Sequence, residues 1–139
     1  FDPDVLLLVL DKDHTTSENI RHTKKFVVAL PSEDQKKTAL DLGSVHGRDV
    51  GNKLQIKDVK TEKSQKFGLD VMSGALAYFE CELQDEMLFE EKGICLSKVV
   101  NVYVKDDSWD DKEECFNPGF KRTLHHVTGS TFCSGGELV

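Results

Sequence analysis

ALAYFECEL, residues 75–83, is the stretch that decides the fold class of this chain. Small or apolar residues at the odd positions alternate with a mixed set at the even positions that includes two glutamates. Successive side chains of a β-strand point to opposite faces, so this alternation predicts a strand with one face in the core. ICLSKVVNVYVK, residues 94–105, repeats the pattern. The two stretches, joined by a loop over residues 84–93, predict a hairpin in an antiparallel sheet.

Two further strands and two helices are predicted upstream. VLLLVL (residues 5–10) and FVVAL (residues 26–30, ended by Pro31) are typical of buried strands. Residues 15–18 and 32–35 have capping-box spacing, which predicts helices over residues 16–25 and 32–42, the second stopped by Gly43. Residues 124–138 indicate a last strand and turn. The chain is therefore expected to form one α+β, sheet-dominated domain over residues 1–139 with two short helices.

Composition excludes several classes of partner. The formal net charge of -7 argues against nucleic acid, because phosphate binding requires a basic surface. The apolar run at residues 5–10 is far shorter than the roughly 20 residues that a membrane-spanning helix needs. Cys81, Cys95, Cys115 and Cys133 include no C-x-x-C pair, which favours free thiols in a reducing compartment over a disulfide framework. We therefore expect a cytoplasmic protein with no membrane partner.

One glycine-containing stretch is a candidate ligand loop. DLGSVHGRDVGNK, residues 41–53, matches neither the G-x-x-x-x-G-K-[ST] phosphate loop nor the G-x-G-x-x-G dinucleotide fingerprint. It follows a predicted helix and offers Arg48 and Lys53 to an anion, with His46 available for polar or stacking contacts. Two interpretations remain open, a structural turn and a loop that holds a ligand.

Metal and nucleophile chemistry receive little support. Neighbouring residues of a strand point to opposite faces, so His125 and His126 cannot both bind one metal ion without a local twist. One of them remains free to face a ligand pocket. The acidic run at residues 106–114 lacks the glycine and ligand spacing of a calcium loop, which favours a solvated turn. No local motif marks any cysteine as a nucleophile.

The order of the segments along the chain resembles the flavin reductase-like FMN-binding family, especially its flavoredoxin branch. The N-terminal half of the resemblance lies in DPDVLLLVL (residues 2–10), TSENI (16–20), KFVVALPS (25–32), GSVHGRD (43–49) and KL (53–54). The C-terminal half lies in ALAYFEC (75–81), SKVVNVYV (97–104), LHHVTG (124–129) and GE (136–137). The resemblance therefore extends over nearly the whole chain.

The resemblance implies a split β-barrel that binds FMN without a covalent bond, as a homodimer with the flavin near the subunit interface. Members reduce flavin with NAD(P)H or pass electrons to a redox partner protein. The isoalloxazine carries the redox chemistry, while the protein supplies phosphate donors, ring contacts and charge near the ring nitrogens. NAD(P)H-dependent flavin reduction and flavoredoxin-like electron transfer are both expected activities.

The resemblance also implies a set of cofactor-binding residues and no catalytic side chain. The segment that opens the first helix would hold the FMN phosphate or ribityl chain, and Thr15 has the alternative role of a helix cap. The glycine-bearing loop would lie beside the cofactor, and the closing histidine would lie near the flavin or nicotinamide. The implied residues are Thr15, Thr16, Asn19, His46, Gly47, Arg48, Asp49, Lys53, and His125 or His126.

Two departures from the family pattern keep a second function open. Glu90-Glu91-Lys92 stands where the family commonly has Gly-Asp-His, and the resemblance begins after the family's first strand, so that strand is expected to be missing from the barrel. Both departures favour a non-enzymatic, dimeric split-barrel protein with weak or absent FMN binding. A third class, a split barrel that handles a metal or haem, rests on the His125-His126 pair alone.

Overall fold

The computed structural model describes residues 4–56, 58–105, 107–117 and 119–136. The ends of the expected segments at residues 2–3 and 137–138, and the start of the acidic run at residue 106, lie outside the described residues. The described chain forms a sheet-dominated α+β fold with five α-helices.

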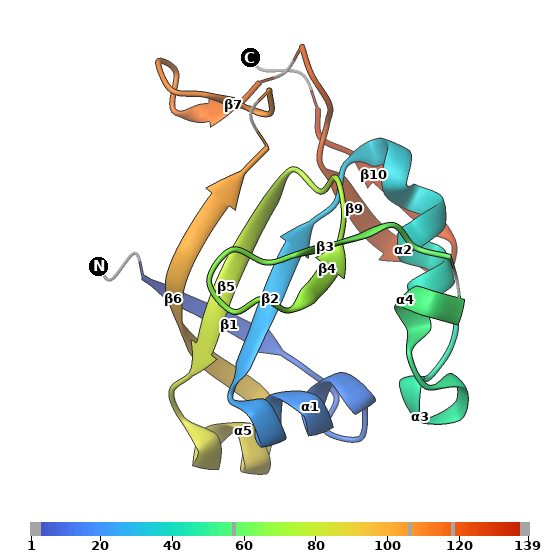
Figure 1. Cartoon of the computed structure of the whole chain (residues 1–139), viewed down its shortest axis with the longest axis vertical. Coiled ribbons are helices and arrows are strands. Elements are labelled where there is room, and N and C mark those ends of the chain that lie inside the picture. The colour runs from blue at the N-terminus through green and yellow to red at the C-terminus, as the bar shows by residue number, and fades with distance from the viewer. Residues whose placement is uncertain (1–3, 57, 106, 118, 137–139) are drawn as a thin grey trace.

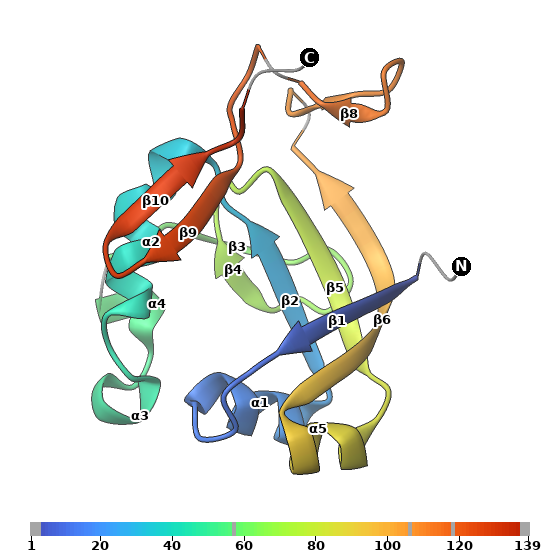
Figure 2. The same cartoon turned by 180° about the vertical axis from the view of Figure 1, so that it is seen from behind.

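Four long strands form the central antiparallel sheet (Figures 1 and 2). They are β1 (Val5–Val9), β2 (Lys25–Leu30), β5 (Ala77–Leu83) and β6 (Ile94–Val104), in the order β1-β6-β5-β2. β5 pairs with β6 from Ala77 opposite Val104 to Leu83 opposite Ser97, with a bulge between Glu80 and Cys81. The predicted hairpin and the two upstream strands are confirmed.

One face of the sheet packs on two helices. α1 (Thr15–Thr23) and α5 (Glu86–Lys92) lie at the same end of the sheet in both views. Ile20 and Phe89 from these helices are buried against Cys95 of β6, and Leu8, Leu10, Phe26 and Leu83 pack around them. Burying an aromatic ring of this size contributes roughly 1.5–3 kcal/mol.

The opposite face of the sheet is also covered, which corrects the prediction of a single core face on β5. A hairpin of β3 (Thr61–Lys63) and β4 (Asp70–Met72) lies over it. Val71 of β4, Ala75 and Tyr78 form a second buried cluster there. The even-numbered side chains Tyr78 and Glu80 are therefore buried beneath the hairpin rather than exposed to solvent.

The prediction of only two helices is wrong, because three short helices form in segments expected to be loops. α3 (Gly47–Val50) and α4 (Lys53–Ile56) occupy the glycine-containing stretch. α5 interrupts the β5–β6 connection: the Asp85 carboxylate accepts the Leu88 N–H at 2.8 Å, and Gly93 ends the helix at φ 69°. A Cβ at Gly93 would lie 2.5 Å from the Leu10 carbonyl oxygen, so glycine is required there.

The two capping boxes have different outcomes. His14, not Thr15, is the N-cap of α1, and its side chain makes no capping bond. At the second box the Ser32 N–H donates to Gln35 Oε1 at 3.1 Å, and a 3-10 turn (Glu33–Gln35) leads into α2 (Lys36–Gly43). The second box is therefore formed, and α2 ends at the predicted glycine.

One last strand was predicted near the C-terminus, and the structure has two there. They form a hairpin of β9 (Leu124–Thr128) and β10 (Thr131–Ser134), which lies beside α2 (Figure 2). A smaller hairpin begins within the acidic run at β7 (Trp109–Asp110) and ends directly after the run at β8 (Cys115–Phe116). All four cysteines are free thiols, and Cys81 and Cys95 are buried. No helix in the described part of the chain is long and apolar enough to cross a bilayer.

Candidate functional site

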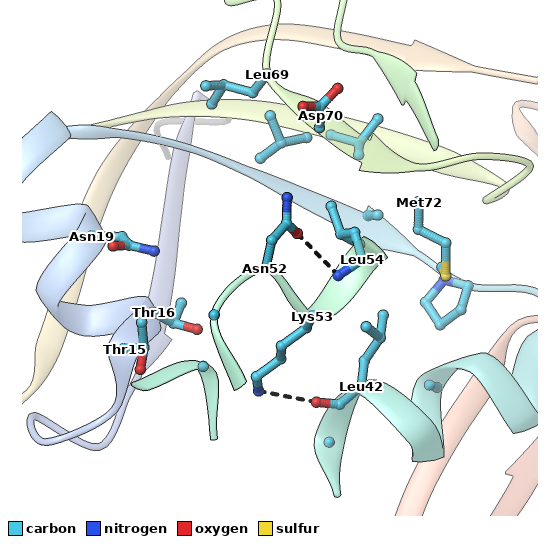
Figure 3. Close-up of a pocket in the computed structure, with 18 residues that line it drawn as sticks. Thr15, Thr16, Asn19, Leu42, Asn52, Lys53, Leu54, Leu69, Asp70 and Met72 are labelled. Atoms are coloured by element: carbon cyan, nitrogen blue, oxygen red, sulfur yellow. Dashed lines mark hydrogen bonds between the residues drawn. The ribbon is translucent and has the colours of Figure 1, made fainter. Parts of the chain in front are cut away.

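A cavity of about 1010 Å³ opens between the sheet and the helices α1 to α4 (Figure 3). Its walls come from five places along the chain: the start of α1, strand β2, the end of α2, residues 47–54, and β4 with the residue before it. Pockets that hold cofactors and other small molecules have volumes of about 300–1,000 Å³. The cavity is therefore large enough for a nucleotide-sized ligand.

One end of the cavity is polar and is built by α1 and α3. Thr15, Thr16 and Asn19 line it from α1, opposite Gly47 and Gly51. The Arg48 N–H donates to Thr15 Oγ1 at 3.1 Å, which joins the two helices. A Cβ on Gly47 would lie 3.1–3.2 Å from three side-chain atoms of Thr15, so the close approach of α3 to α1 depends on this glycine. The structure thus brings together two segments separated by some thirty residues.

Lys53 and Asn52 line the cavity next to this polar end. Lys53 Nζ donates to the Leu42 carbonyl at the end of α2 at 3.0 Å, and Asn52 Oδ1 accepts the Leu54 N–H at 3.1 Å (Figure 3). Asp70 is the one carboxylate among the described lining residues, and Lys63 lies 2.8 Å from it. The ammonium group of Lys53 is thus the cation that an anionic ligand would meet here.

The remainder of the cavity wall is mostly apolar. Val27 and Ala29 of β2, Leu42 of α2, and Val71 and Met72 of β4 line it. A ligand with a charged, hydroxylated end and a flat apolar end matches this division. The residues of β2 and β4 were not predicted as site residues, because this wall forms only where the β3–β4 hairpin packs against β2 of the central sheet.

Glu80 and Tyr78 of β5 fix that hairpin in place. The fully buried Glu80 carboxylate accepts the N–H groups of Lys66 (2.9 Å) and Phe67 (2.8 Å) and the side-chain amide of Asn101 (2.7 Å). Burial alone would raise the pKa of the Glu80 carboxyl, but these donors outweigh burial and lower it.

Tyr78 holds the other end of the hairpin. Its hydroxyl oxygen accepts the Ala75 N–H at 3.0 Å and lies 2.6 Å from Glu62 Oε1 and 2.8 Å from the Met72 carbonyl oxygen. Burial, with the Glu62 carboxylate, raises the pKa of the Tyr78 hydroxyl. The sequence signal for Tyr78 and Glu80 was a polar group at an even-numbered position within the predicted strand at residues 75–83.

Three of the expected site residues lie near the cavity without lining it. The Arg48 guanidinium donates to the Asp13 carbonyl and lies 3.7 Å from Glu18 Oε1. His46 packs its ring 5.5 Å from that of His14, and the Asp49 N–H donates to the His46 carbonyl at 3.1 Å. These contacts hold α3 against the start of α1.

A separate, smaller cavity of about 490 Å³ lies between α2 and the β9–β10 hairpin, which carries both expected histidines, and only one of them lines it. His126 lines it, with Nε2 2.9 Å from the Gly129 carbonyl oxygen and its ring 4.9 Å from that of Phe132. His125 does not line it, and its Nε2 lies 2.8 Å from Thr123 Oγ1. Among the described residues, no group of three His, Cys, Asp or Glu side chains is arranged to hold a metal ion.

Comparison with known proteins identifies the family. The family model described as flavin reductase like domain matches residues 1–126. The chain belongs to the flavin reductase-like family. Among curated relatives of this flavin reductase-like chain is YddH of Escherichia coli K12, an uncharacterized protein, which is 28% identical over 141 residues that span 100% of this chain and 74% of YddH.

Solved structures of flavin reductase-like proteins share the fold. An FMN-binding domain of a flavin reductases-like enzyme from Shewanella baltica OS155 is 26% identical, with a TM-score of 0.81 over 97% of this chain and 72% of that chain. Flavoredoxin of Desulfovibrio vulgaris (Miyazaki F) is 14% identical, with a TM-score of 0.80 over the same shares. The predicted family and fold class are confirmed.

Proposed function

We propose that the chain is a single-domain flavoprotein that binds FMN non-covalently in the 1010 Å³ cavity. The observation that carries the proposal is that Thr15, Thr16, Asn19, Gly47 and Lys53 converge on one cavity. These residues lie in or directly beside the segments at residues 16–20, 43–49 and 53–54, which resemble the family's cofactor-binding segments. The Shewanella baltica relative named as FMN-binding supports the same cofactor.

The donor set suits the phosphate and ribityl end of FMN. The hydroxyls of Thr15 and Thr16 and the amide of Asn19 donate hydrogen bonds, and Lys53 supplies a positive charge. The apolar wall, which includes Val27 and Met72, suits the flat isoalloxazine ring. Bound FMN would supply the redox chemistry, and the chain's own residues would orient it and exclude water.

The proposed activity is NAD(P)H-dependent flavin reduction or flavoredoxin-like electron transfer to a partner protein. Neither activity needs a nucleophilic side chain in the chain itself. We further propose a cytoplasmic homodimer. The edge strand β1 supports the dimer, because Val5, Leu7 and Val9 expose 36%, 58% and 74% of their surface on one face of the sheet.

Absorbance between about 350 and 500 nm, where flavins absorb, tests the cofactor, because a flavin can be followed there with little protein background. FMN is added to the purified protein, which is then desalted; retention of the flavin spectrum is the expected result. Lys53→Gln should lower retention, whereas Lys112→Gln, a change at a lysine whose side chain is 89% exposed, should not. A protein that leaves all FMN free would contradict the proposal. Oxidation of NADH and NADPH with free FMN as acceptor then distinguishes a reductase from a carrier.

A non-enzymatic dimer with weak or absent FMN binding is the second candidate. The segment that replaces the family's Gly-Asp-His, Glu90-Glu91-Lys92, lies at the end of α5, where Glu90 Oε1 is 3.0 Å from Arg21 Nε. This position is therefore used for an ion pair between α5 and α1. A dimer in sedimentation velocity that binds no flavin would favour this candidate.

A further inference from the structure

The 490 Å³ cavity is separated from the proposed FMN cavity by a thin wall. Pro31, Ala39 and Gly43 line both cavities, so the wall between them is made of a ring, a single methyl group and a glycine. A Cβ added at Gly43 would meet no atom within 4 Å, which shows that open space adjoins the wall at this point. The two cavities are therefore neighbours across the last turns of α2.

The lining of the smaller cavity is mostly apolar and includes an aromatic ring. Leu40, Leu124 and Phe132 contribute its larger apolar side chains, and none of the described residues that line it is a carboxylate. Its volume lies in the range of small-molecule sites, about 300–1,000 Å³. Apolar walls and an aromatic side chain favour an uncharged ligand with an aromatic ring of its own, through area burial and ring stacking.

His126 adds one directional polar group. The Gly129 carbonyl oxygen, 2.9 Å from His126 Nε2, can only accept a hydrogen bond, so Nε2 carries the hydrogen. In the neutral ring Nδ1 is then an acceptor. An acceptor beside an apolar cavity favours a ligand that brings a hydroxyl donor.

We propose that this cavity binds a small uncharged phenol, whose ring lies among Leu40, Leu124 and Phe132 and whose hydroxyl donates to His126 Nδ1. Binding at this site does not depend on FMN, so it goes beyond the proposed flavin chemistry. Its position across a thin wall from the other cavity would place the phenol next to bound flavin.

The test compares 4-methylphenol with 4-methylanisole, which has the same ring but no hydroxyl donor. Each is titrated into the 15N-labelled full chain without FMN, and amide shifts are followed by NMR. We expect saturable shifts at Gly43, Gly129 and Phe132, with 4-methylanisole binding roughly 2- to 10-fold more weakly for the loss of one hydrogen bond. Equal affinities, shifts located elsewhere, or no saturable shifts would each overturn the proposal.

Variants test the role of His126 separately. His126→Phe should weaken 4-methylphenol to the level of 4-methylanisole and leave 4-methylanisole unchanged. His125→Phe, at the neighbour that does not line the cavity, should change neither affinity. Should His126→Phe fail to fold, the wild-type comparison of the two ligands still decides the proposal.

A repeat of the titration with saturating FMN separates this proposal from the proposed function. If the protein binds no FMN, the phenol shifts are expected all the same. If FMN itself shifts Gly129 and Phe132 and excludes 4-methylphenol, the smaller cavity belongs to the flavin site and the proposal of a separate phenol site is wrong.

Discussion

The carboxylate of Glu80 accepts the backbone N–H of Phe67 at 2.8 Å, which ties the centre of the main sheet to the turn that precedes β4. Glu80 is fully buried and receives further bonds from Lys66 and Asn101. Because Leu69 and the β4 residues line the large cavity, this single carboxylate helps to set the position of one cavity wall.

Glu80→Gln should lower the free energy of unfolding by about 1.5–3 kcal/mol, the range for hydrogen bonds to a charged group. The glutamine amide presents a donor to N–H groups that are themselves donors. Urea denaturation measures the change. Glu82→Gln, on the same strand at a half-buried position, is the control and should change stability much less. Equal losses in the two variants would contradict the role given to Glu80.

The pKa of Glu80 predicts a loss of stability in acid. Because the folded-state pKa is lowered, the contribution of Glu80 is present above the unfolded value, about pH 4.3, and is lost as the pH falls through the folded-state pKa. Asp34, whose pKa is lowered by Lys121 and Ser32, acts in the same direction. Urea midpoints measured between about pH 3 and 7, which spans both carboxyl types, should fall less steeply toward acid in Glu80→Gln than in the wild type. Parallel curves would argue against a charged Glu80.

Gly47→Ala should weaken FMN retention, because the new methyl group would lie 3.1–3.2 Å from Thr15 and push α3 away from α1. Overpacking of this kind costs about 1–3 kcal/mol. Flavin absorbance after desalting measures the effect. Adding Thr15→Ala to this variant removes two of the three crowded atoms, but it also removes a hydroxyl group that is proposed to bind FMN.

The control for Gly47→Ala is Gly136→Ala, where a Cβ meets nothing within 4 Å. This control should leave FMN retention unchanged. Normal retention in Gly47→Ala would mean that the close approach of α3 to α1 does not shape the cofactor site.

Phe89→Ala should destabilise the fold by roughly 3–5 kcal/mol, because the buried ring joins α5 to Ile20 and Cys95 and its loss leaves a cavity. Met87→Ala, on the same helix at a residue that is 72% exposed, should change stability by no more than about 0.5 kcal/mol. Thermal unfolding followed by circular dichroism compares the two. If Phe89→Ala lost as little stability as Met87→Ala, α5 would lie outside the cooperatively folded core.

The strands of the main sheet could be predicted from sequence because their signal is local. The alternation in residues 75–83 and 94–105 and the apolar runs at residues 5–10 and 26–30 each need only their own residues. Helix α5 was missed because its seven residues are set mainly by the Asp85 cap and by Gly93, and the segment is too short to show a clear helical period.

The candidate site also contains residues that could be predicted and residues that could not. The resemblance to a family pointed to Thr16, Asn19, Gly47 and Lys53, which do line one cavity. Met72 and its neighbours could not be predicted, because their place depends on a distant hairpin, to which Tyr78 donates a hydrogen bond and from which Glu80 accepts one. His126 was separated from the other candidates by the fold, which gives it a cavity of its own.

The thiols of the chain differ sharply in access, and this difference offers a way to observe the smaller cavity. Burial raises the pKa of the Cys81 thiol to about 11 and also raises that of Cys95, whereas Cys133 is exposed on β10 directly after Phe132. A maleimide dye at neutral pH should therefore label Cys133 readily, with Cys115 replaced by serine to remove the half-buried competitor. Fluorescence from that single position would report when a small molecule enters beside Phe132, without any redox reaction taking place.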